Sequence, residues 1–75
     1  MQIREIFAAN LRRARRAAGM SQEDLAHRAD IDRTYVSALE RAVYAVSIDV
    51  IDRLATALGI EPADLLVRPR RTRST

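Results

Sequence analysis

The chain has 75 residues, enough for one small domain whose core is near the lower limit for independent stability. It contains no cysteine, which excludes disulfide frameworks, thiolate zinc sites and cysteine nucleophiles. Its net charge of +3 is unevenly distributed: residues 1–16 and 68–75 are strongly basic, whereas residues 17–67 carry an excess of acidic side chains.

All basic side chains are arginine and none is lysine. Arginine favours bidentate contacts with phosphate and guanine, but a GC-rich genome would produce the same usage, and both explanations stay open. No apolar run approaches the length of a membrane span, and Arg4 and Glu5 stand where a signal peptide has its apolar region. We therefore expect a cytoplasmic protein without a membrane partner.

Residues from about 3 to 18 are predicted to form an amphipathic helix, because Ile3, Phe7 and Leu11 recur at helical spacing. Gly19 can supply the left-handed residue that ends this helix, and Met20 can fold back on its last turn. The polar face is expected either to be solvated or to contact phosphate through some of its four arginines: Arg12, Arg13, Arg15 and Arg16.

The segment 21–41 has the pattern of two short helices joined by a tight turn. Ser21 and Asp24 can form a capping box at the start of the first helix, and Asp32 can cap the second. Ala26 is small where the two axes should approach most closely. The apolar residues fall where two crossing helices need them: Leu25, Ala26, Ala29, Ile31, Val36 and Leu39.

These residues, with Gln22 and the closing Glu40-Arg41 pair, resemble the Xre/Cro/C1-type helix-turn-helix family of bacterial and phage regulators over about residues 6 to 66. Within that family, the short chain favours a bare regulator such as a restriction-modification controller or a small phage-type repressor. The resemblance implies that Arg15 pairs with Glu40. The chain departs from the family's pattern at two positions that commonly hold Gly: here they are Asp30 and Ala42. Asp30 is expected to adopt the left-handed conformation.

Residues 41–46 are predicted to form a loop in which Tyr44 either packs against the core or directs its hydroxyl outward to a phosphate. Ser47 can cap a fourth helix that ends at Gly59, and Pro62 suits the first turn of a short fifth helix. The expected fold is all-α: a compact five-helix bundle, with one domain spanning residues 1–69. Residues 70–75 are predicted to be a disordered basic tail.

Nothing in the sequence indicates catalysis, a metal or a cofactor. His27 is the only histidine, and its place on the outer side of the motif's first helix is more typical of a surface residue than of a ligand or base. The aspartates are predicted to be turn, cap or surface residues without a nucleophile or metal partner at suitable spacing. The sequence therefore predicts a binding protein, not an enzyme.

A helix-turn-helix presents the N-terminal part of its second helix to base edges in the major groove, while its first helix crosses the DNA backbone. In the predicted reading helix, residues 33–41, Arg33 can bind guanine with two hydrogen bonds. Thr34 and Ser37 can bond to several base edges, and Ala38 can meet a thymine methyl group. Phosphate contacts are assigned to Gln22, whose role follows from the family resemblance, and to Tyr35, Arg41 and Tyr44.

A homodimer is expected on double-stranded DNA, because one reading helix covers only a few base pairs. Leu65 and Leu66 are assigned to the dimer interface, since the last helix is too short to bury both. A two-fold pair would place the reading helices about 34 Å apart on a pseudo-palindromic operator. The alternative is a protein-interaction module with the same fold, either an antitoxin whose main partner is a toxin or a bridging factor.

Overall fold

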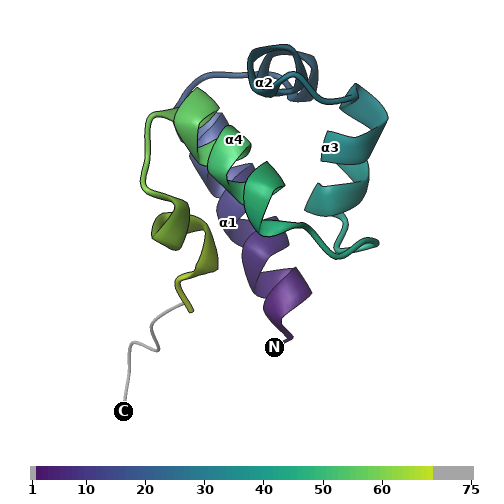
Figure 1. Ribbon diagram of the computed structural model, residues 1–75, viewed down its shortest axis with the longest axis vertical. Helices are drawn as coiled ribbons and strands as arrows, with labels where there is room; N and C mark the ends of the chain where they lie inside the picture. The colour runs from purple at the N-terminus through teal and green to yellow at the C-terminus, as the bar shows by residue number, and fades with distance from the viewer. Residues whose placement is uncertain (1, 69–75) are drawn as a thin grey trace.

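The protein is a helical bundle, seen in a computed structural model that describes residues 2–68. Within that range the secondary structure is entirely helical, without strands (Figure 1). The elements in chain order are α1 (Ile3–Ala17), α2 (Gln22–Ala29), α3 (Arg33–Glu40), α4 (Ile48–Leu58) and η1 (Pro62–Leu66). The predicted basic tail, residues 70–75, and the predicted domain limit at residue 69 lie outside the described residues.

The fifth element, η1, is a 3-10 helix, so the expected count of five α-helices is wrong. It has only five residues, and the chain returns to an extended conformation at Val67. The side chain of Asn10 in α1 donates hydrogen bonds to the carbonyls of Leu65 (3.0 Å) and Val67 (2.9 Å). These two bonds hold the end of η1 against α1. The helix is therefore limited to a short segment that begins at Pro62, and short segments favour the tighter 3-10 form.

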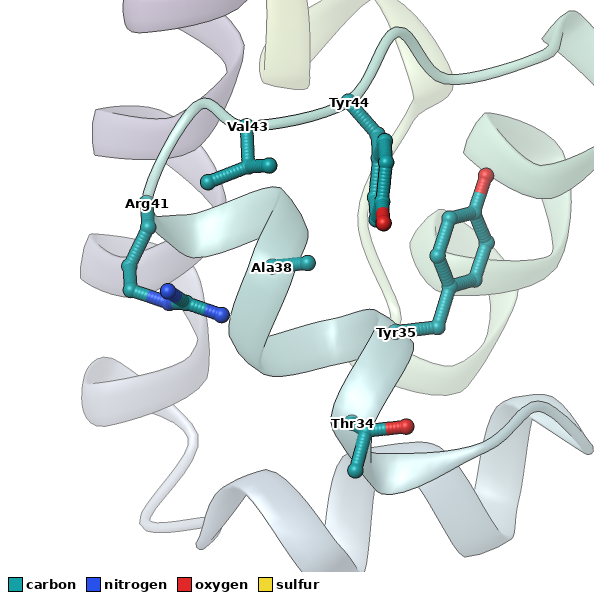
Figure 2. Close-up of a pocket in the computed structure, with 6 residues that line it drawn as sticks. All are labelled: Thr34, Tyr35, Ala38, Arg41, Val43 and Tyr44. Atoms are coloured by element: carbon teal, nitrogen blue, oxygen red, sulfur yellow. The ribbon is translucent and has the colours of Figure 1, made fainter.

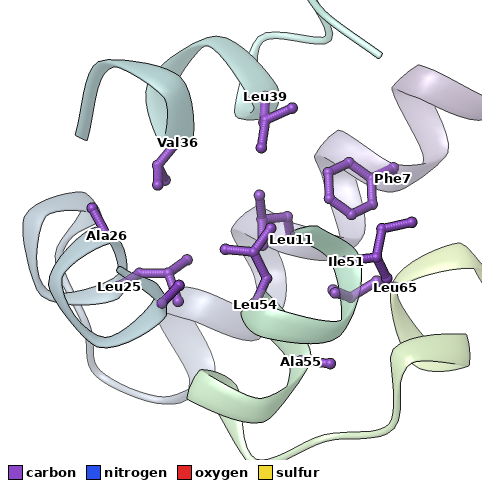
Figure 3. Packing of buried hydrophobic residues seen from close by; sticks show 11 residues of the cluster. Phe7, Leu11, Leu25, Ala26, Val36, Leu39, Ile51, Leu54, Ala55 and Leu65 are labelled. Atoms are coloured by element: carbon purple, nitrogen blue, oxygen red, sulfur yellow. The ribbon is translucent and has the colours of Figure 1, made fainter. Parts of the chain in front are cut away.

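A single hydrophobic core joins the elements (Figure 3). α2 packs on α3 and α4, α1 packs on α3, and η1 packs on both α1 and α4. Ala26 is 3% exposed, as expected for a small side chain at the crossing of two helices. The core draws on every element and includes Phe7, Leu11, Leu25, Ala29, Val36, Leu39, Ile51, Leu54 and Leu65.

Side-chain caps begin the helices as the sequence predicts. In the capping box of α2, the N–H of Asp24 donates to Ser21 Oγ (3.0 Å) and the N–H of Ser21 donates to the Asp24 carboxylate (3.1 Å). The hydrogen bonds from Ser21 lower the pKa of Asp24. Asp32 accepts from the N–H of Thr34 at the start of α3 (3.0 Å). These caps fix where each helix of the motif begins.

Each of the four α-helices is followed by a residue in the left-handed conformation: Gly19 (φ 70°), Asp30 (φ 58°), Ala42 (φ 60°) and Gly59 (φ 71°). In each case the next N–H returns to the helix, as when Met20 donates to the carbonyl of Arg15 (3.1 Å). Glycine adopts this conformation without a Cβ penalty, whereas an alanine pays roughly 1–2 kcal/mol. The loop after α3 therefore keeps the path of a glycine turn at a cost in stability.

The left-handed conformation of Asp30 confirms the sequence-based expectation and leads to a test. We expect Asp30→Gly to be neutral or stabilising and Asp30→Val to lower the free energy of unfolding by about 1 kcal/mol or more, because a β-branched residue resists positive φ. Arg53 donates to the carbonyl of Asp30 (2.6 Å), and both variants keep that carbonyl. Thermal melts in which Asp30→Val matches the parent would contradict this account.

Candidate nucleic-acid interface

A buried ionic network sets the two helices of the motif relative to α1. The side chain of Glu40 is 3% exposed and accepts from Arg15 Nε (2.6 Å) and Arg15 Nη2 (3.0 Å), which confirms the pairing implied by the family resemblance. Gln22 Nε2 donates to the same carboxylate (3.1 Å). Burial raises the pKa of Glu40, but the hydrogen bonds from Arg15 and Gln22 and the charge of Arg15 outweigh it and lower the pKa. One carboxylate thus joins α1, α2 and α3.

The N-terminal turn of α3 is open to solvent. Arg33 and Thr34, two of the residues assigned to base reading, are both exposed. The Thr34 hydroxyl bonds to the Asp32 carboxylate, so its orientation is fixed by the cap of its own helix. Within residues 2–68, Arg33 has no hydrogen bond to another side chain or carbonyl, which leaves its guanidinium available to a ligand. Ser37, one turn further on, is half-buried.

Ala38 was assigned to base reading, which needs an exposed side chain, but only 4% of this residue is exposed, so the expected exposure is wrong. The reason is tertiary: after Ala42 the chain turns back along α3, and the N–H of Val43 donates to the carbonyl of Ala38 (3.0 Å). Figure 2 shows Ala38 on the helix surface with Val43 and Tyr44 above it. Ala38 is therefore the floor of a hollow of about 410 Å³, lined also by Thr34, Tyr35, Arg41, Val43 and Tyr44.

The two tyrosines form one wall of this hollow. Their ring centroids are 6.5 Å apart and the rings are tilted by 44° (Figure 2). Tyr44 is 58% exposed, so of the two alternatives the structure shows the outward one. Tyr35 is half-buried and packs against the core, so it lies between the core side and the solvent side of α3. Arg41 is exposed at the end of α3, and its Nε donates to the carbonyl of Ser37 (3.3 Å).

Gln22 is the first residue of α2 and is half-buried. Its amide nitrogen bonds to Glu40, a contact that spacing along the chain did not reveal. A primary amide has two N–H donors, so one of them is used inside the protein. The backbone N–H groups of Gln22 and Glu23 are further donors at this helix start, whereas the N–H of Asp24 is bonded to Ser21.

The two leucines assigned to a dimer interface differ in burial. Leu65 is 0% exposed and belongs to the core of its own chain, so its assignment was wrong; the amphipathic pattern of η1 turns this residue inward, where Asn10 also holds its carbonyl. Leu66 is 41% exposed. It lies with Ile3, which is 54% exposed, along a second, mainly apolar hollow of about 390 Å³.

No other arrangement of polar side chains in residues 2–68 suggests chemistry. His27 is exposed on α2, as predicted. The described residues contain no group of three or more His, Asp and Glu side chains that could hold a metal ion. None of the helices described is long and apolar enough to cross a membrane.

The motif consists of two short helices, α2 and α3, joined by a left-handed turn and fixed by a buried ion pair. The start of α3 is open to solvent and carries Arg33. These features define a helix-turn-helix DNA-binding regulator. The chain belongs to the helix-turn-helix family, which residues 11–65 match. This membership confirms the resemblance read from residues 21–41.

Proteins similar to this chain include regulators and control proteins. It is 45% identical over 65 residues to the control protein C.BamHI of Bacillus amyloliquefaciens, covering 85% of this chain and 80% of the relative. It is 41% identical over 68 residues to a hypothetical transcription factor of Neisseria meningitidis, covering 91% of this chain but only 64% of the relative. The structure of the restriction-modification controller C.AhdI from Aeromonas hydrophila superposes with a TM-score of 0.81 at 47% identity, covering 83% of this chain and 94% of that one.

Proposed function

We propose that this regulator binds a pseudo-palindromic operator as a homodimer and reads each half-site with α3. The observation that carries the proposal is the open N-terminal turn of α3, where Arg33 and Thr34 are exposed on a helix whose other face is buried in the core. The major groove of B-DNA admits one α-helix. The likeness to C.BamHI and C.AhdI supports a role in controlling restriction-modification genes.

The proposed contacts divide into reading and positioning. Arg33 binds guanine O6 and N7 through its forked guanidinium, and Thr34 and Ser37 bond to base edges. The other residues of the site contact phosphate oxygens and position the protein on the DNA. At the start of α2, backbone N–H groups and the positive end of the helix dipole also favour a phosphate. These positioning residues are Gln22, Tyr35, Arg41 and Tyr44.

The proposed partner chain is a second copy. Leu66 and Ile3 present apolar side chains that the single chain leaves half-exposed, and a dimer doubles the number of base pairs that are read. A solved relative at 26% identity, C.Esp1396I, forms a tetramer with its 35 base-pair operator, which supports assembly on DNA. The relatives named above are regulators and control proteins rather than antitoxins, which favours a DNA target over a toxin.

Selection from a pool of random duplexes tests this function directly. We expect enrichment of an inverted repeat whose half-sites each contain a guanine, with centres about 34 Å apart along the helix axis. Recovery of no common sequence, at a salt concentration where non-specific binding is weak, would contradict sequence-specific binding.

The homodimer is tested separately by sedimentation on the selected site. The complex is expected to contain two chains per site, and Leu66→Ala should lower the affinity for the full site more than the affinity for a single half-site. A complex with one chain on a full site would rule the dimer out.

A further inference from the structure

The hollow beside α3 lies on the proposed DNA-reading side; Ala38 and Val43 give it an apolar part, and Thr34 and Arg41 add polar groups to its lining. We propose that it receives the C5-methyl group of one thymine in each half-site, and that Val43 and Tyr44, from the loop after α3, act as specificity-determining residues. This inference rests on the proposed function and names one base that the protein reads.

The placement of the hollow supports a ligand in the major groove. Thr34, Ala38 and Arg41 line one side of it and follow one another at successive turns of α3, so they share one face of the helix. Thr34 also belongs to the exposed first turn proposed to meet base edges. DNA docked on that turn therefore faces the mouth of the hollow.

The chemistry of the interior selects the group that it holds. The floor is the methyl group of Ala38, and the walls include the aliphatic side chain of Val43 (47% exposed) and the aromatic ring of Tyr44 (58% exposed), both on a loop that faces solvent (Figure 2). Base edges in the major groove present hydrogen-bond donors and acceptors, and the thymine methyl is the one apolar group among them. Thymine is thus the base whose edge gains most from this surface.

The hollow is preformed in the protein. Left-handed Ala42 turns the chain, and the bond from the N–H of Val43 to the carbonyl of Ala38 fastens the loop to α3. The rings of Tyr35 and Tyr44 lie next to each other and form one wall. At the rim, exposed Arg41 supplies a positive charge suited to the phosphate beside the bound base. A fixed surface of this kind loses little conformational entropy on binding.

Replacing each thymine of the selected site by deoxyuridine, which lacks only the methyl group, tests the inference. One position per half-site should lose about fourfold in affinity, the value for burying one methyl-sized group, and the other positions should be unaffected. Val43→Ala should reduce this loss toward none, and Tyr44→Ala should do the same, whereas Tyr44→Phe keeps the ring and should keep the loss.

Val67→Ala is the matched control, since it makes the same change at a valine that is 55% exposed and lies beyond η1. This variant should keep the full fourfold discrimination. The inference is overturned if the selected site contains no thymine, if no position responds to deoxyuridine, or if Val43→Ala responds as strongly as the parent. Specific binding that persists in these cases leaves the proposed function intact, whereas failure to select any sequence removes the function itself.

Discussion

Arg15→Met is expected to lower the free energy of unfolding by about 3–5 kcal/mol, the largest effect of any single change considered for this protein. The substitution leaves the Glu40 carboxylate, 3% exposed, inside the junction of α1, α2 and α3 with only Gln22 as a hydrogen-bond partner. Small domains have a total stability of only about 5–15 kcal/mol, so much of it should be lost. Urea denaturation measures the change.

Two further variants separate the buried charge from the other consequences of losing an arginine. Arg16→Met makes the same change one residue along α1, at an exposed position, and should shift stability by no more than about 0.5 kcal/mol. The double variant Arg15→Met/Glu40→Met removes both charges and should be more stable than Arg15→Met alone. If the double variant is the less stable of the two, the penalty does not come from the unpaired carboxylate.

The same network makes stability depend on pH, with opposite signs in parent and variant. In the parent the folded pKa of Glu40 is lowered, so its contribution is complete above the ordinary glutamate value of about 4.3 and is lost as the pH falls through the folded pKa. Without Arg15, burial is opposed only by the hydrogen bond from Gln22 and the charge of Arg12. We expect the folded pKa to rise above the unfolded value, so that the variant gains stability as the pH falls. The difference between the two proteins should therefore shrink from neutral pH toward about pH 4. A constant difference would contradict this account.

Arg33→Ala is expected to weaken binding to the selected operator by about 1–3 kcal/mol and to affect random DNA much less. Arg33 is the long, forked donor in the exposed first turn of α3, and a bidentate bond to guanine is lost only where that guanine is present. The preference should therefore relax mainly at one guanine in each half-site. Titrations on the selected and on a scrambled duplex, at one salt concentration, measure both losses.

Gln22→Ala provides the contrast, because a phosphate contact carries no sequence information. It should weaken binding to the two duplexes by a similar factor. Since Gln22 also bonds to Glu40, these titrations need a temperature at which the variant is fully folded. Equal losses on both duplexes for Arg33→Ala would make Arg33 a backbone contact and move the reading role to Thr34 and Ser37.

Local rules accounted for the helix boundaries. Ser21, Asp32 and Ser47 each cap the helix that the sequence assigned to them, because a cap involves residues only two or three positions apart. The same locality explains why Gly19 ends α1 and why Asp30 could be predicted to be left-handed. Helical periodicity likewise identified most of the core, since one face of each helix must meet the others.

Side-chain exposure around α3 and η1 could not be read in the same way, because it depends on segments that return from elsewhere in the chain. Helical periodicity places Ala38 on the outer face of α3, but the loop that carries Val43 covers it. Leu65 was expected at a dimer interface, but the packing of η1 on α1 buries it. The two hydrogen bonds from Asn10 that hold this segment span 55 and 57 residues.

Short-range spacing along the chain was enough to predict the class of fold, the limits of the α-helices, the helix-turn-helix and the residues at the open start of α3. Contacts between distant segments were needed to show that Glu40 joins three helices, that Gln22 takes part in that network and that Ala38 is the floor of a hollow rather than an exposed reading residue. The physical reason is the same in each case: burial and ion pairing are set by contacts between elements, and a helical pattern shows which face is apolar but not what covers it.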